Sequence, residues 1–421
     1  MLPDAGAVGP PFAAIHDAAA RKTFFAFHHG SAATPEAIGV ASLDHASGTV
    51  ARPTLLPPGK AGRAGDALSL DLDSSGTIWL CAGSGDGEPA RLFKSNRPHE
   101  IGAFTSTQGP ALGSPVLHVV GERGLLVLGL ISSAHGTAVA ASTSADGQSW
   151  SPPRPLVAID AGQTFLTGRF RDKIGLVLAA FTAEEGPRAP GNVYYLESPD
   201  AGRSWQTVRR VPIDRLPIQA ADHPTKVWDY RSARWAALLK SLAFDSFGNP
   251  VIAYLVGSPR RTGPPRYTWT TSRWTGREWE TTGILPASSA DDGGVLQVGA
   301  DRTWRLLTVR NGHLEAPPGA AAEPRLAAWS SDDQGRSWNR LFASPGADSQ
   351  RHAVFRPFDA PPDCDAFWIS AADAVAGGPI RILDRQGTVL TLPGRMTADH
   401  DKPIPNAETI PPSTQPATRP E

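Results

Sequence analysis

Residues 198–205 read SPDAGRSW and residues 331–338 read SDDQGRSW, so these two segments share the pattern S-x-D-x-G-x-S-W at every fixed position. Residues 144–150, SADGQSW, are a third copy that is one residue shorter, and residues 272–279, SRWTGREW, keep the frame without the aspartate. The tryptophans that close the copies stand at positions 150, 205, 279 and 338, which are 55, 74 and 59 residues apart. Such a period predicts a repeat architecture with one four-stranded sheet and a loop per repeat.

The residue types in this pattern are those of a β-hairpin corner. Aspartate accepts hydrogen bonds from the backbone N–H groups of a turn, glycine adopts a positive φ, and tryptophan packs between sheets. A second recurring element is a strand, a D-x-x-G turn and another strand, found at residues 73–76, 245–248 and 384–387. We therefore assign both motifs a structural role.

Laid along the chain, the two motifs divide it into seven units of the size of a sheet. These units span residues 13–56, 67–105, 115–156, 164–211, 238–285, 292–343 and 352–394. The sequence thus predicts an all-β fold, a seven-bladed β-propeller of four-stranded antiparallel blades, with six blades as the alternative if an irregular terminal unit merges with its neighbour. Residues 1–394 form one domain in this interpretation, and the proline-rich residues 395–421 are expected to be a disordered tail.

The composition excludes several classes of protein. Among 421 residues there are 42 Gly and 40 Pro, which disfavour helices, and 40 Lys+Arg against 41 Asp+Glu give a net charge of -1. This balance lacks the long-range attraction expected of a general nucleic-acid binder, and no apolar run is long enough to span a membrane. Cys81 and Cys364 are too far apart in sequence for a closely spaced metal motif, and we expect two buried free thiols rather than a bridge.

The S-x-D-x-G-x-S-W copies resemble the Asp-box, or BNR repeat, of sialidase-like propellers. The resemblance is closest to the fourth BNR-repeat family, which includes ulvan-type polysaccharide lyases. It extends over most of the chain, from SLDHASGTVARPTLL near the N-terminus through GTIWL, LFKSNRPHEI, NVYYLESPDAGRSW, DSFGNPVIAYL, YTWTTSRWTGREWE and AAWSSDDQGRSW to DAFWISAAD. It implies the propeller fold more strongly than it implies an activity, because a fold alone does not fix function.

The same resemblance indicates a changed catalytic site. Where the lyase family carries D-A-H-D-N-P, this chain reads RAGDAL, so Gly65 replaces the histidine and only Asp66 is retained as a substrate-binding candidate. Ser84 stands where a second family histidine is expected, and residues 287–298, ASSADDGGVLQV, lack the histidine and tyrosine of the corresponding loop. Loss of one acid–base group commonly costs about 10²–10⁴ in rate, so unchanged lyase chemistry is not expected.

Five polar residues match other positions of the family pattern. Tyr230 and His352 are the candidates for moving protons, and Arg231, Lys240 and Arg356 are the candidates for binding a carboxylate or sulfate. If they act together, they must meet in one cleft on the top face of the propeller. In the alternative interpretation, the tyrosine and the lysine pack in the wall between blades while the arginines satisfy backbone carbonyls.

Two functions remain open at this stage. The first is a propeller that binds an anionic glycan through its top face with an eroded or altered catalytic site. The alternative is an active polysaccharide lyase or glycoside hydrolase with a non-standard residue set; sialidase chemistry is less favoured because the usual arginine segment before the first blade is absent. We expect no cofactor and no metal, since His28-His29 alternate across a strand and Asp291-Asp292 read as a solvated turn rather than a calcium site. A monomer is expected; an extracytoplasmic location is implied by the resemblance only, as no signal peptide is found in this sequence.

Overall fold

The computed structural model describes ten stretches of the chain, with side chains except at residues 12, 29, 30, 35, 36 and 122, and five further strands by their backbone. The ten stretches are residues 12–30, 35–57, 67–83, 88–133, 136–160, 162–182, 188–259, 265–299, 302–310 and 326–343. The five strands are residues 352–355, 364–370, 380–384, 388–392 and 408–409.

The described strands pair into seven antiparallel sheets, each built from strands that follow one another in the sequence. The first sheet contains β1 (Phe12–Asp17), β2 (Lys22–Gly30), β3 (Pro35–Asp44), β4 (Thr49–Val50) and β5 (Thr54–Leu56). The second contains β6 (Ala67–Leu72), β7 (Ile78–Gly83), β8 (Pro89–Ser95) and β9 (Phe104–Ala111). The third contains β10 (Gly113–Val119), β11 (Leu125–Ser133), β12 (Gly136–Ser144) and β13 (Arg154–Val157), with a 3₁₀ turn, η1 (Gly121–Arg123), after β10.

The remaining four sheets follow the same order. The fourth contains β14 (Gly162–Phe170), β15 (Lys173–Phe181), β16 (Gly191–Ser198) and β17 (Lys226–Trp228). The fifth contains β18 (Ala236–Phe244), β19 (Pro250–Ser258), β20 (Arg266–Trp274) and β21 (Trp279–Ala287). The sixth contains β22 (Gly293–Val298), β23 (Trp304–Val309), β24 (Leu326–Ser331) and β25 (Asn339–Ala343). The last contains β26 (His352–Phe355), β27 (Cys364–Ser370), β28 (Ile380–Asp384), β29 (Thr388–Leu392) and β30 (Glu408–Thr409).

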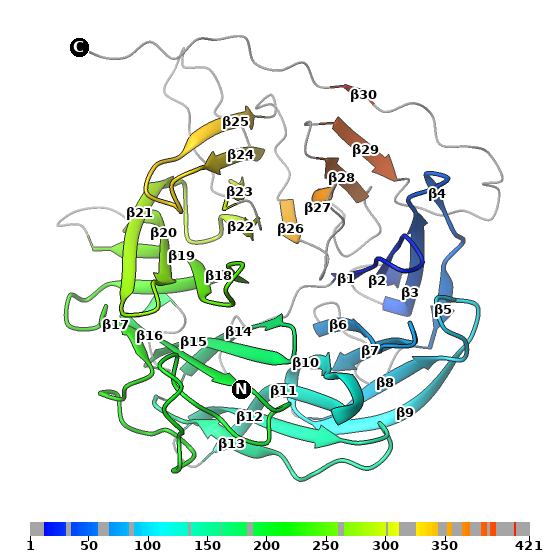
Figure 1. The fold of residues 1–421 in the computed structure, drawn as a ribbon, viewed down its shortest axis with the longest axis horizontal. Helices are drawn as coiled ribbons and strands as arrows, with labels where there is room; N and C mark the ends of the chain where they lie inside the picture. Colours follow the sequence, from blue (N-terminus) through cyan, green and yellow to red (C-terminus); the bar gives the residue numbers. More distant parts are fainter. Residues whose placement is uncertain are drawn as a thin grey trace.

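The sheets stand around a common centre, with the first strand of each sheet innermost (Figure 1). The predicted all-β propeller of four-stranded antiparallel blades is thereby confirmed. The predicted count of seven is corrected to the alternative of six, because described side chains pack blade against blade through six sheets. The sheet β26–β30 lies next to β22 and β23, but only its backbone is described. Its last strand, Glu408–Thr409, pairs with β29 and falls within the segment expected to be a tail.

The core of the propeller lies between neighbouring blades. Five clusters of buried side chains join the first blade to the second and so on to the sixth. Because each blade is sandwiched between two others, its middle strands are largely apolar on both faces; β16 is buried throughout, and β15 is buried except at Lys173. Cys81 is one of these core residues; it is a free thiol, and burial raises its pKa to about 12.

The predicted repeat turns connect the third and fourth strands of four blades. The carboxylate of Asp200 accepts hydrogen bonds from the backbone N–H of Ser204 at 2.8 Å and from its hydroxyl at 2.7 Å. Gly202 has a φ of 84° and donates its N–H to the Ser198 hydroxyl. Trp205, which closes this repeat, is 2% exposed and lies in the core between the third and fourth blades. The aspartate and the glycine of the pattern thus stabilise the turn, and its tryptophan forms a contact between two blades.

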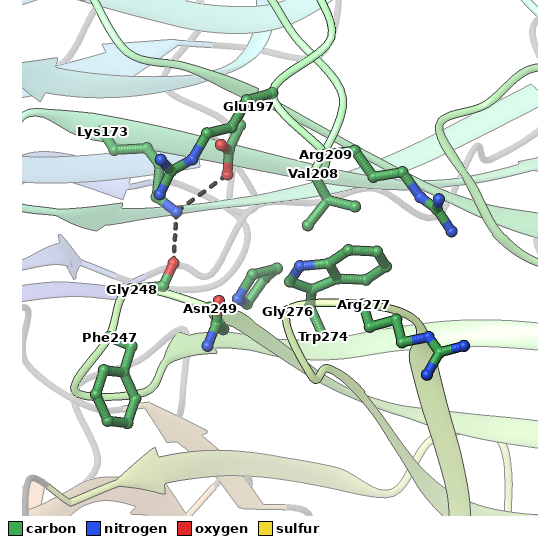
Figure 2. A pocket seen from close by; sticks show the side chains of 12 residues that line it. Lys173, Glu197, Val208, Arg209, Phe247, Gly248, Asn249, Trp274, Gly276 and Arg277 are labelled. Atoms are coloured by element: carbon green, nitrogen blue, oxygen red, sulfur yellow. Dashed lines mark hydrogen bonds and ion pairs between the residues drawn. The ribbon is translucent and has the colours of Figure 1, made fainter.

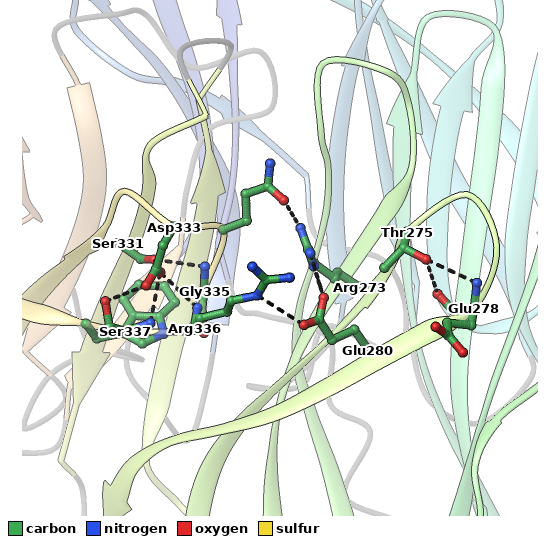
Figure 3. Close-up of polar contacts among 11 residues, drawn as sticks. Arg273, Thr275, Glu278, Glu280, Ser331, Asp333, Gly335, Arg336 and Ser337 are labelled. Atoms are coloured by element: carbon green, nitrogen blue, oxygen red, sulfur yellow. Dashed lines mark hydrogen bonds and ion pairs between the residues drawn. The ribbon is translucent and has the colours of Figure 1, made fainter.

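Neighbouring repeat turns are also tied to each other. Glu280 of the fifth blade accepts a hydrogen bond from Arg273 of its own blade at 2.7 Å and one from Arg336 of the sixth blade at 3.2 Å. Arg273 also donates to Gln334, at the turn of the sixth blade (Figure 3). This network links the two turns at one edge of the ring.

The strand directions define two faces of the propeller. In each blade the chain begins its first strand at one edge and ends its fourth strand at the same edge, which we call the top face. The D-x-x-G turns of residues 73–76 and 245–248, which follow a first strand, and the repeat turns, which follow a third strand, all lie at the opposite edge. We call that edge the bottom face. A site on the top face is therefore built from the loops that join one blade to the next and the loops after each second strand.

Candidate functional site

Tyr230 lies in the wall between the fourth and fifth blades. Its side chain is 3% exposed, and its hydroxyl forms a hydrogen bond with the hydroxyl of Tyr254 at 2.9 Å. This series of hydrogen bonds continues from the Tyr254 hydroxyl to that of Ser272 at 2.6 Å and from Ser272 to the Thr281 hydroxyl at 2.7 Å. Burial, together with the neighbouring Tyr254, raises the pKa of Tyr230 far above its ordinary value. This geometry gives Tyr230 the wall position of the alternative interpretation.

Two tryptophans flank this tyrosine at the top face. Trp228 ends the outer strand of the fourth blade, and Trp235 directly precedes the inner strand of the fifth. The ring of Trp235 stacks on Tyr230 with centroids 6.2 Å apart, and Trp228 lies at the same distance from Tyr230 with its ring tilted by 44°. Trp228 is 45% exposed and Trp235 is 38% exposed, although both are large apolar residues. The buried tyrosine thus supports an aromatic surface that faces solvent.

Arg231 follows Tyr230 in the same loop and is held by an acid from another blade connection. Both terminal nitrogens of its guanidinium donate to the carboxylate of Asp160, in the loop between β13 and β14; the Nη1 contact is 3.2 Å long. The backbone N–H of Arg231 donates to the Asn192 side chain at 3.0 Å. The bond to Asp160 raises the pKa of Arg231, so this side chain stays cationic. Its side chain remains 35% exposed, so it is accessible from solvent.

Lys240 stands at a β-bulge of the innermost strand of the fifth blade. The pairing of β18 with β19 shifts between Leu239 and Ser241, and such a bulge redirects the intervening side chain. The Lys240 ammonium donates to the backbone carbonyl of Ala290 at 3.1 Å, in the top-face loop that leads to the sixth blade. Burial lowers the pKa of Lys240 to about 8, against the opposing effect of Asp292 and Asp291. The lysine therefore satisfies a backbone carbonyl, a role that the alternative interpretation gave to the arginines, and its pKa lies near neutral pH.

The loop next to Lys240 differs from the solvated turn expected for the two aspartates. Asp292 is 1% exposed, and its carboxylate accepts the backbone N–H of Ser288 at 2.6 Å and the hydroxyl of Ser289 at 3.3 Å. Asp291 points outward and pairs with Arg188 at 2.8 Å, from the loop after β15. Among the described residues, no group of three or more His, Cys, Asp or Glu side chains is arranged to hold a metal ion.

The other predicted site residues cannot be placed in this region. Asp66 and Arg356 lie outside the described residues, as do Gly65 and Ser84, and of His352 only the backbone at the start of β26 is described. Of the five residues expected to converge, the structure therefore locates three. Tyr230 and Arg231 share one top-face loop, and Lys240 lies on the strand that follows it.

Sequence reasoning missed both exposed tryptophans and the acid that holds Arg231. The segment from Trp228 to Trp235, WDYRSARW, contained a signal, because two tryptophans enclose the candidate tyrosine and arginine within eight residues. Asp160 gave no comparable signal, since it lies 71 residues before Arg231 and meets it only through the arrangement of blades.

A comparison with known families matches the middle part of the chain. Residues 122–285, which run from the third blade to the fifth, match the model described as a BNR repeat-containing family member. The middle part of the chain is therefore similar to this family. Among curated proteins, none has a sequence that matches this chain.

Solved structures of polysaccharide lyases share the fold of this propeller. An ulvan lyase of family PL25, bound to -[GlcA(1-4)Rha3S]-, is 17% identical with a TM-score of 0.69, covering 90% of this chain and 93% of its own. The same type of lyase without that ligand gives a TM-score of 0.70 at 17% identity over the same shares of both chains. The polysaccharide lyase Uly1 is 11% identical with a TM-score of 0.58, covering 90% of this chain and 87% of its own. Among the described residues, no helix has the length and apolar character needed to cross a membrane.

Proposed function

We propose that this propeller binds an anionic glycan at its top face, between the fourth and fifth blades, and that its lyase site is eroded. The observation that carries the proposal is the exposed pair Trp228 and Trp235 beside Arg231. Aromatic rings provide flat apolar surfaces against which sugar rings can stack, and a guanidinium binds carboxylate or sulfate. Asp160 holds the arginine in place from a second loop, so the cation is oriented before a ligand arrives.

Two observations support the loss of catalysis. The positions of the two family histidines are Gly65 and Ser84 in this sequence. Tyr230, a candidate for moving protons, is buried and its pKa is raised well beyond the range in which a phenol exchanges protons at neutral pH. A group in that state is a poor acid and a poor base.

The test is a panel of ulvan, pectin, alginate and glycosaminoglycans, scored for retention of the protein and for release of unsaturated uronate absorbance. We expect retention on at least one polysaccharide and no absorbance at any pH. Trp228→Ala and Arg231→Ala should each weaken binding roughly tenfold, as expected for aromatic and arginine contacts at the centre of a site. The exposed Arg52→Ala serves as the control, with melting temperatures confirming that all variants fold. Turnover of any polysaccharide would refute the eroded site, and unchanged binding by both variants would refute the location.

One observation favours an alternative, an active lyase with a different base. Lys240 keeps a pKa of about 8, and a lysine in that state can accept a proton near neutral pH. β-Elimination of a uronate needs such a base at C5 and an acid at the leaving oxygen. If the panel reveals turnover, the rate should rise with pH as Lys240 loses its proton, and Lys240→Arg should abolish it. Turnover that survives this substitution would exclude Lys240 as the base.

For the intact protein we propose a monomer that acts outside the cytoplasm, to be checked by light scattering and by fractionation of producing cells.

A further inference from the structure

A pocket of about 470 Å³ opens on the bottom face between the fourth and fifth blades. The lining residues that matter here are Lys173, Glu197, Arg209, Arg210, Phe247, Trp274 and Arg277. The lining comes from the segment that follows the repeat turn of the fourth blade, from the D-x-x-G turn of the fifth blade and from the repeat turn of the fifth blade. The pocket therefore lies at the opposite end of the blades from Trp228 and Arg231.

The floor of this pocket is electrically neutral. Lys173 forms an ion pair with Glu197 at 3.0 Å and also donates to the backbone carbonyl of Gly248 (Figure 2). Glu197 accepts further hydrogen bonds from Tyr195 at 2.9 Å and Gln206 at 3.0 Å. The carboxylate is 4% exposed, so it is fully engaged below the pocket and does not neutralise cations at the rim.

The rim carries three arginines with no acidic partner among the described residues. Arg209, Arg210 and Arg277 are all exposed. The guanidinium of Arg209 lies 5.5 Å from the ring centre of Trp274, and Figure 2 shows Arg209 and Arg277 together on the side of Trp274 away from Lys173. Stacking on the indole limits the freedom of Arg209 and holds its charge at the opening. The rim is thus a local positive site on a chain with a net charge of -1.

An exposed aromatic ring borders the same opening. Phe247 is 73% exposed, more than any other large apolar residue described, and it sits in the D-x-x-G turn that forms one wall. The turn is fixed by Asp245, which accepts the backbone N–H of Phe247 at 2.9 Å and that of Asn249 at 2.8 Å. A rigid turn therefore presents the ring at the edge of the pocket, on the Lys173 side, with Trp274 between it and the arginines Arg209 and Arg277 (Figure 2).

We propose that this pocket is a second binding site, for a saccharide that carries a sulfate or phosphate ester. The arginines bind the tetrahedral oxyanion through charge-assisted hydrogen bonds, and the sugar ring packs against Phe247. The inference does not depend on glycan binding at the top face, because it uses none of the residues of that site.

The experiment is calorimetric titration of the full chain with three probes at low salt: a heparin-derived disaccharide with one 6-O-sulfate, the same disaccharide without sulfate, and inorganic sulfate. We expect binding of the sulfated disaccharide, at least roughly tenfold weaker binding of the unsulfated form, and weakening with rising salt. Arg209→Gln combined with Arg277→Gln should reduce the affinity for the sulfated form by roughly tenfold or more. Phe247→Ala should weaken the sulfated disaccharide without changing the affinity for inorganic sulfate.

The matched control is Arg154→Gln, an exposed arginine at the bottom end of the third blade, which should bind as the unaltered protein does. Equal binding of the sulfated and unsulfated disaccharides, or full affinity in the double arginine variant, would overturn the proposal. Inorganic sulfate binding as tightly as the sulfated disaccharide would overturn the saccharide part. The top-face variant Trp228→Ala separates the two sites. If the titration reports binding in the pocket, this variant should bind the sulfated disaccharide as the unaltered protein does.

Discussion

Lys240 shows how a single side chain can link stability to pH in this protein. Its folded pKa of about 8 lies below the ordinary value of 10.5, so between these pH values the unfolded chain binds a proton that the folded chain has released. The free energy of unfolding therefore rises with pH across this window. From pH 7.5 to 10.5 we expect the unfolding free energy of the unaltered protein to rise by about 2–3 kcal/mol relative to that of Lys240→Met, measured by urea denaturation. A difference independent of pH would show that the lysine is not desolvated.

Asp200 tests the structural role of the repeat aspartates. Its carboxylate accepts a backbone N–H and a hydroxyl of Ser204 and the hydroxyl of Ser198 at 3.0 Å, and the pKa of Asp200 is lowered as these bonds and nearby Arg123 outweigh desolvation. We expect Asp200→Ala to lower the free energy of unfolding by about 1–2 kcal/mol, because turn donors lose their acceptor. The control is Asp172→Ala, an exposed aspartate in another hairpin turn, which should change the melting temperature little.

At the scale of strands and blades, close approach between neighbours decides which residues are tolerated. Gly294 lies in the innermost strand of the sixth blade, and a Cβ there would be 2.5 Å from the ring of Trp269 in the fifth blade and 2.7 Å from the carbonyl oxygen of Leu307. The backbone oxygen belongs to the paired strand β23 and cannot move without disturbing the pairing.

We expect Gly294→Ala to lower the free energy of unfolding by about 1–3 kcal/mol, because overpacking forces the two blades apart. Gly283→Ala is the matched control: its Cβ would meet only Thr268 at 3.6 Å, an ordinary contact. Thermal unfolding of both variants compares them, and equal melting temperatures would mean that the blade contact adapts freely.

At the scale of the whole molecule, the two proposed sites lie on opposite faces of one ring. If both bind, a short sulfated uronate oligosaccharide should titrate with two sites per chain. We expect one site in Trp228→Ala/Arg231→Ala and one in Arg209→Gln/Arg277→Gln, with little binding when all four substitutions are combined. If the unaltered protein shows a single site and only one of the two double variants loses it, all binding belongs to the face that carries that variant's substitutions. Two sites in the quadruple variant would place binding elsewhere.

The propeller was predictable because its repeats are local. The turns at residues 144–150, 198–205 and 331–338 each bring their own acceptor, glycine and tryptophan, so the sequence pattern is also the structural unit. Strand alternation and turn spacing then follow from a few residues at a time. The blade count was harder, since whether a sheet joins the ring depends on contacts between blades.

The candidate site was only partly predictable, because it is assembled across blades. The sequence alone determined the fold class and the positions of the turns, and it identified the segment with Tyr230 and Arg231 as a candidate site. The tertiary structure decided that Tyr230 is buried while Trp228 is exposed, and that Arg231 meets an acid 71 residues away. Burial and long-range pairing arise only when the blades pack side by side, and no local pattern in the chain encodes which surface each residue will face.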